Sequence, residues 1–141
     1  MIRYSIDALR KVRSKLTFSE DAGRERHWRI LLVEDDRDTA LLLGSFLERA
    51  GHEVHLAADP EEAIRELVTH WPEVVIVDIG LPVMDGYELA ERIRAVAHCK
   101  LIAISGYSAD SARPATAVSS FDRHLVKPVD HDTLLRTLHA L

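Results

Sequence analysis

Five short segments rich in apolar residues alternate with amphipathic stretches, and this alternation is the feature that most constrains the fold. The segments recur at intervals of about 22 residues, and those at 30–33, 74–77 and 101–104 are continuously apolar, as is typical of strands buried on both faces. Strands that alternate with helices favour a parallel sheet covered by helices on both sides. The sequence therefore predicts an α/β fold with a doubly wound, five-stranded parallel sheet and five helices. The predicted strands are residues 30–33, 54–57, 74–77, 101–104 and 123–126.

Helix-capping residues stand at the expected places between these strands. Asp36 or Asp38 can cap the first helix, which Gly51 follows, and Asp59 with Pro60 marks the start of the second. Asp130 can cap the last helix. The helix expected over residues 108–120 is poorly signalled because the segment is mostly Ser and Ala.

Composition agrees with one soluble domain of 141 residues, 47% of them hydrophobic and 29% charged. The single cysteine, Cys99, cannot form an intramolecular disulfide, and we expect a packed thiol in a reducing compartment. We find neither an apolar run long enough to span a bilayer nor the apolar region of a signal peptide. A cytoplasmic protein is therefore expected, and its net charge of −5 argues against nucleic acid as a partner.

Charge divides the chain into two parts. Residues 1–27 hold 7 Lys and Arg against 4 Asp and Glu, whereas residues 28–141 carry a net charge of −8. Apolar residues at helical spacing within 1–17 predict an amphipathic helix, which gives a basic N-terminal extension before one domain at 28–141. Four roles are open for that helix: it packs on the domain, pairs with its copy in a homodimer, docks on a partner protein, or lies on a membrane surface. The sequence does not decide among them.

Polar residues that carry chemistry follow four of the five predicted strands. Because ligand sites in such sheets lie beyond the carboxyl ends of the strands, we expect these residues to converge. Two carboxylates about 4 Å apart repel by about 4 kcal/mol at an effective dielectric near 20, which a divalent cation such as Mg²⁺ would offset. The residues are Glu34 and Asp35 after the first strand, Asp78 after the third, Ser105 after the fourth and Lys127 after the fifth.

This set suggests a division of roles. Asp35 and Asp78 would bind Mg²⁺ directly, Glu34 would act nearby or through water, and the backbone carbonyl of Gly80 would add a ligand. A carboxylate held by a metal and facing a phosphoryl donor is a competent nucleophile. Ser105 and Lys127 would bind the phosphoryl oxygens.

Four motifs at these strand ends resemble the receiver domain of response regulators in two-component signalling. They occur in the family's order and spacing, and the resemblance covers about Arg29 to Leu141. It implies a flavodoxin-like fold that uses Mg²⁺ and accepts a phosphoryl group from a histidine kinase or a phosphotransfer protein, without being a turnover enzyme. The motifs are ILLVEDD, VVIVDIGLPVMDGYEL, LIAISGY and HLVKPV.

The resemblance also implies roles for individual residues. Asp78 matches the phosphoacceptor, Glu34 and Asp35 the acidic pair, Ser105 the switch hydroxyl and Lys127 the family's lysine. His124 stands where the family usually has Tyr or Phe as a second switch residue, which mildly favours a phosphorelay context.

Several alternatives and expectations accompany this interpretation. A Mg²⁺-dependent phosphohydrolase with an aspartate nucleophile is less favoured because Gly80 replaces its usual second Asp, and a degenerate receiver would serve only as an interaction module. Because the last predicted helix ends at Leu141, we expect output by protein contact, without direct DNA binding. His52 and His55 are expected to be packed or solvated, since neither has a partner at the spacing of a metal motif.

Overall fold

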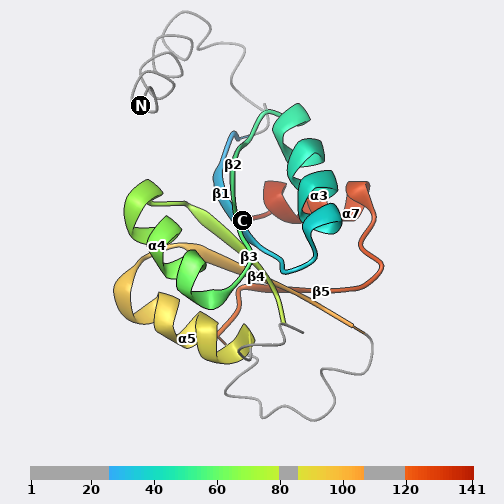
Figure 1. Cartoon of the computed structure of the whole chain (residues 1–141). Coiled ribbons are helices and arrows are strands. Elements are labelled where there is room, and N and C mark those ends of the chain that lie inside the picture. Colours follow the sequence, from blue (N-terminus) through green and yellow to red (C-terminus); the bar gives the residue numbers. More distant parts are fainter. Residues whose placement is uncertain (1–25, 80–85, 107–119) are drawn as a thin grey trace, which may run out of the picture.

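The structure is a computed structural model that describes residues 26–79, 86–106 and 120–141. Five strands lie side by side in one sheet, and helices cover both of its faces (Figure 1). All strand pairs are parallel, in the order β2-β1-β3-β4-β5. The strands are β1 (Arg29–Val33), β2 (Glu53–Ala57), β3 (Val74–Asp78), β4 (Lys100–Ser105) and β5 (Arg123–Val126), and the helices are α3 (Arg37–Arg49), α4 (Pro60–His70), α5 (Gly86–Val96) and α7 (His131–His139).

The predicted sheet is confirmed, and all five strands lie where the sequence placed them to within one residue at either end. The described residues hold four helices rather than the predicted five, because the helix expected over 108–120 falls outside the described ranges. The predicted N-terminal helix also lies outside them. Within the described part of the chain, no helix is long and apolar enough to cross a membrane.

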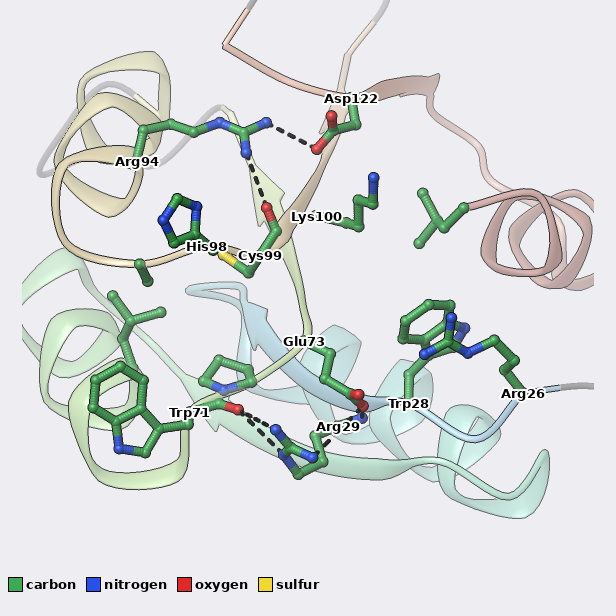
Figure 2. A pocket seen from close by; sticks show the side chains of 14 residues that line it. Arg26, Trp28, Arg29, Trp71, Glu73, Arg94, His98, Cys99, Lys100 and Asp122 are labelled. Atoms are coloured by element: carbon green, nitrogen blue, oxygen red, sulfur yellow. Dashed lines mark hydrogen bonds and ion pairs between the residues drawn. The ribbon is translucent and has the colours of Figure 1, made fainter. Parts of the chain in front are cut away.

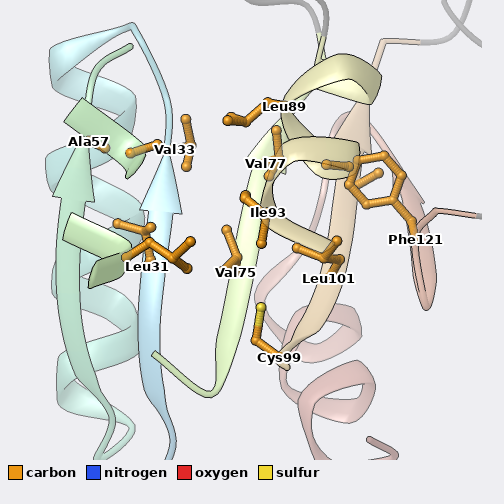
Figure 3. Close-up of a cluster of buried hydrophobic side chains, with 14 of the residues drawn as sticks. Leu31, Val33, Ala57, Val75, Val77, Leu89, Ile93, Cys99, Leu101 and Phe121 are labelled. Carbon is orange, nitrogen blue, oxygen red and sulfur yellow. The ribbon is translucent and has the colours of Figure 1, made fainter. Parts of the chain in front are cut away.

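Two apolar cores sandwich the sheet because alternate residues of each strand face opposite sides. Leu31, Val33, Val75 and Val77 face α4 and α5, and Figure 3 shows them against Leu89 and Ile93 of α5, with Phe121 at the end of the cluster. On the other face, strand residues such as Ile30 and Ile76 pack against α3 and α7. Cys99 is buried in the first core, as expected of a packed thiol.

Helix caps fix where each connection leaves the sheet. Asp36, Asp59 and Asp130 accept a hydrogen bond from the backbone N–H three residues later, which confirms Asp36 rather than Asp38 as the first cap. Gly51 follows α3 with a φ of 103°, a conformation that favours glycine.

Gly86 brings the start of α5 close to the end of β3. A Cβ at this position would lie 2.7 Å from the Cα of Ile79, nearer than real Cβ atoms approach a backbone. The helix can therefore sit directly beside the residue that follows Asp78 only because residue 86 lacks a side chain.

Candidate functional site

Sheet order brings the predicted site residues to one end of the molecule, which we call the carboxyl edge: Glu34, Asp35, Asp78, Ser105 and Lys127. β1, β3, β4 and β5 are consecutive neighbours in the sheet; Glu34 and Asp35 follow β1, and the other three strands supply one residue each. The order reverses between β1 and β3, which is the position where ligands bind in doubly wound sheets. The convergence predicted from the sequence is thus present.

Three carboxylates form the acidic part of this edge. Ligand atoms of Glu34, Asp35 and Asp78 all lie within 4.8 Å of one another. Glu34 and Asp78 are buried, at 7% and 8% exposure, whereas Asp35 is exposed to solvent. This arrangement concentrates negative charge in a place where water screens it poorly.

The pKa of Glu34 reflects both its burial and the negative charge beside it. Burial of its carboxyl group raises the pKa to about 7, and the negative charge of Asp78 adds to the increase. The backbone N–H of Asp36 donates a hydrogen bond of 3.1 Å to Oε2 of Glu34 and opposes the shift. Three convergent carboxylates, two of them buried, are chemically suited to a hard divalent cation. The carbonyl of Gly80, predicted as a further ligand, lies outside the described residues.

Lys127 supplies the positive charge of the carboxyl edge. Its Nζ donates a hydrogen bond of 3.0 Å to Oδ2 of Asp78, and its side chain is 44% exposed. Burial alone would lower the pKa of Lys127, but the hydrogen bond to Asp78 and the nearby carboxylates outweigh burial and raise the pKa. The ammonium group is therefore charged, and one side of it faces solvent.

Ser105 and His124 meet beside this charged group. Ser105 is fully buried at the end of β4, and its Oγ lies 3.4 Å from Nε2 of His124 on the neighbouring strand β5. The imidazole of His124 also lies near the rings of Tyr87 and Phe121. His124 thus occupies a partly aromatic niche next to the Ser105 hydroxyl.

The opposite end of the sheet, which we call the amino edge, carries a pocket of a different character (Figure 2). Arg94 donates to Oδ2 of Asp122 at 2.8 Å and to the carbonyl of Cys99 at 2.9 Å. Arg29 donates to the carbonyl of Trp71 and lies 3.8 Å from Glu73. Arg29 and Arg94 each have an acidic partner, and Arg26 lies 4.0 Å over the ring of Trp28, so carboxylates do not gather here as they do at the carboxyl edge.

One cluster was missed by the sequence analysis. His52 is a packed histidine, as expected, and its Nδ1 accepts a hydrogen bond from the backbone N–H of Trp28. His55 is also packed, against Glu66 and His70 of α4, although these partners do not stand at the sequence spacing of a metal motif. The missed signal was the Glu-x-x-x-His spacing on a helix that must cover an edge strand.

Comparison with known proteins identifies the family. The family model of the response regulator receiver domain matches residues 30–139. The uncharacterized transcriptional regulatory protein YvcP of Bacillus subtilis is 30% identical over 81% of the chain, which spans 48% of that protein. The chain spans about half the length of several curated relatives that it matches.

Solved structures agree. A receiver domain from Methylobacillus flagellatus superimposes with a TM-score of 0.74 at 27% identity, covering 82% of this chain and 98% of that one. The response regulator TrrA of Thermotoga maritima, solved in complex with Mg²⁺ and BeF, has a TM-score of 0.70 at 31% identity and covers 78% of this chain and 95% of its own. The chain therefore belongs to the response regulator receiver domain family of two-component systems.

Proposed function

We propose that the domain is a phosphoacceptor switch in which Asp78 takes up a phosphoryl group from a phosphohistidine. The observation that carries this proposal is the contact between Lys127 and Asp78 beside two further carboxylates. Asp78 alone among these groups is held at the end of a central strand with an ammonium group 3.0 Å away. A carboxylate oriented in this way has a cation beside the position where transferred charge would develop.

The transfer step is a substitution at phosphorus. An oxygen of the Asp78 carboxylate attacks the phosphorus atom, an acyl phosphate forms, and the P–N bond of the donor breaks with its electron pair passing to the imidazole, which then takes up a proton. Because its side chain is partly exposed, the ammonium group of Lys127 can also donate hydrogen bonds to the incoming phosphoryl oxygens. Hydrolysis of the acyl phosphate by water would return Asp78 to its starting state and would make the domain reset itself.

Glu34, Asp35 and Asp78 would hold Mg²⁺, with the Gly80 carbonyl as a further predicted ligand. Bound Mg²⁺ would supply positive charge that neutralises the carboxylates and the phosphoryl oxygens. Support comes from the convergence of the three carboxylates within 4.8 Å and from the relative TrrA, which was solved with Mg²⁺ and BeF.

Ser105 and His124 would relay the change. A phosphoryl group on Asp78 offers new acceptor oxygens to the Ser105 hydroxyl, which would give up its long contact with His124. The side chain of His124 would then shift its population between two positions beside Tyr87 and Phe121. We propose that this switch acts in the cytoplasm, receives its phosphoryl group from a histidine kinase or a phosphotransfer protein, and gives its output by protein contact.

The direct test is phosphorylation with a small donor. Wild-type protein incubated with Mg²⁺ and acetyl phosphate should gain one phosphoryl group by intact mass, and hydroxylamine should remove it, as it does for acyl phosphates. Asp78→Asn should gain none, whereas the matched control Asp122→Asn at the amino edge should be labelled like wild type.

Three results would contradict the proposal: no label on wild type, a label that persists on Asp78→Asn, or a label that depends equally on Asp122. Sustained release of phosphate from phosphate esters over many turnovers would instead support the phosphohydrolase.

A further inference from the structure

A second group of potential ligands lies on the edge strand of the sheet, away from the carboxyl edge. His55 comes from β2, and Glu66 and His70 come from the last turns of α4. One ligand atom from each lies within 4.8 Å of the other two. Glu53, two residues before His55, points to the same face of β2 because strand side chains alternate.

The distances within this cluster are close to those of a metal site. Oε1 of Glu66 lies 3.2 Å from Nε2 of His70 and 3.8 Å from Nδ1 of His55. In a tetrahedral Zn²⁺ site with bonds of about 2.0–2.1 Å, neighbouring ligand atoms are separated by about 3.3 Å. The distances from Glu66 to His70 and to His55 therefore lie within about half an ångström of this separation.

Glu53 fits the part of a supporting carboxylate. Its Oε2 lies 3.0 Å from Nε2 of His55, on the other side of the ring from Glu66. A histidine that binds a metal through Nδ1 carries its proton on Nε2, and a carboxylate that accepts this proton fixes the tautomer and increases the basicity of the ligand. The side chain of Glu53 is only 9% exposed, so it is held in that place.

Solvent access also suits an ion at this cluster. Side chains of His55 and His70 are 15% and 17% exposed, and Glu66 is 28% exposed, which leaves a route from solvent. The two imidazole rings are stacked at 3.7 Å with an interplanar angle of 5°. Ion binding would tilt the rings out of this parallel stack so that both nitrogen lone pairs point to the metal.

We propose that His55, Glu66 and His70 form a binding site for a Zn²⁺-class ion, supported by the hydrogen bond between His55 and Glu53. Two imidazoles and one carboxylate are a common three-residue set for Zn²⁺, with water in the fourth position. Glu53 is the first residue of β2 and His70 the last of α4, so the site lies toward the amino ends of the strands. It is thus distinct from the Asp78 cluster, and an ion there would tie the edge strand to the helix that covers it.

The test measures Zn²⁺ binding by competition with a chromophoric chelator, in excess Mg²⁺ so that the carboxyl edge is occupied. Wild type should bind one Zn²⁺ per chain, and His70→Gln and Glu66→Gln should weaken binding by about 100-fold or more. Glu53→Gln should weaken it by about 10-fold, as is typical of a supporting carboxylate. His98→Gln, at an exposed histidine, and Asp78→Asn should both bind like wild type.

A second measurement on wild-type protein does not depend on how the variants fold. Co²⁺ substituted for Zn²⁺ should shift the ring-proton NMR signals of two of the eight histidines, and these should belong to His55 and His70. Three results would overturn the site: no stoichiometric Zn²⁺ binding, binding unchanged in His70→Gln, or shifts centred on other histidines. Loss of Zn²⁺ binding in Asp78→Asn would likewise place the ion at the carboxyl edge and overturn it.

Discussion

The two ends of the sheet use charge in opposite ways. At the amino edge, Arg94 and Asp122 form a close pair, and the carboxylate of Asp122 also accepts a hydrogen bond of 2.8 Å from the backbone N–H of Leu101. At the carboxyl edge, three carboxylates share one lysine, and the pKa of Glu34 is raised to about 7. Paired charges tie loops together, whereas accumulated like charges create a demand for a cation or a phosphoryl group.

The pKa values of the two edges express the same contrast. Burial raises the pKa of Glu34, but for Asp122 the hydrogen bond from Leu101 and the charge of Arg94 outweigh burial and lower the pKa. Both groups are carboxylates near the end of a strand. The different surroundings therefore make Asp122 part of a structural ion pair and Glu34 part of a candidate reactive site, although both are carboxylates.

Replacing one lysine at each edge should give the largest difference in the rate of phosphoryl uptake. Lys127→Met should slow phosphoryl uptake from acetyl phosphate by about 100-fold, because a charged donor to the transferred oxygens typically contributes this much. Lys100→Met, at an exposed lysine of the amino-edge pocket, should stay within about twofold. A time course of phosphorylation followed by intact mass measures both rates. Equal rates in the two variants would contradict the role assigned to Lys127.

Mg²⁺ should stabilise the fold through the carboxyl edge only. At about 100 times its dissociation constant, an ion that binds the native state adds about 2.7 kcal/mol to the free energy of unfolding. Urea denaturation should show this gain in wild type and in Asp122→Asn, and removal by EDTA should abolish it. Asp35→Asn should gain less than half as much at the same Mg²⁺ concentration; an undiminished gain would place the ion elsewhere.

The ion pair of the amino edge should matter for stability in a pH-dependent way. The pKa of Asp122 in the folded state is below its ordinary value of 3.8. Its negative charge therefore stabilises the fold above pH 3.8, and this contribution is lost as the pH falls through the folded-state pKa. Asp122→Asn should therefore lower the free energy of unfolding by about 1 kcal/mol at pH 7, a modest value because the pair is partly exposed. The deficit should shrink toward pH 3 in urea titrations, and a constant deficit would show that charge is not its cause.

Most of the sheet and the positions of the site residues could be predicted because both depend on local pattern and topology. Apolar segments locate the strands, and a parallel sheet collects whatever follows them, which is why Glu34, Asp78 and Lys127 were found. The prediction could not supply the burial of Glu34 or its raised pKa, since both depend on packing across strands. The cluster around His55 was missed for a related reason, because its ligands come from two elements brought together only by the fold.

A substitution of His124 should have the smallest effect on phosphoryl uptake, and it tests which part of the carboxyl edge depends on charge. Its contact with Ser105 is long, at 3.4 Å, and its ring lies near Tyr87 and Phe121, so shape matters more than hydrogen bonding there. His124→Tyr should keep the rate of phosphoryl uptake within about threefold of wild type and should change the affinity for a partner protein instead. Intact mass with acetyl phosphate measures the first effect. A loss approaching that of Lys127→Met would mean that the imidazole belongs to the phosphoryl-binding group rather than to the relay behind Ser105.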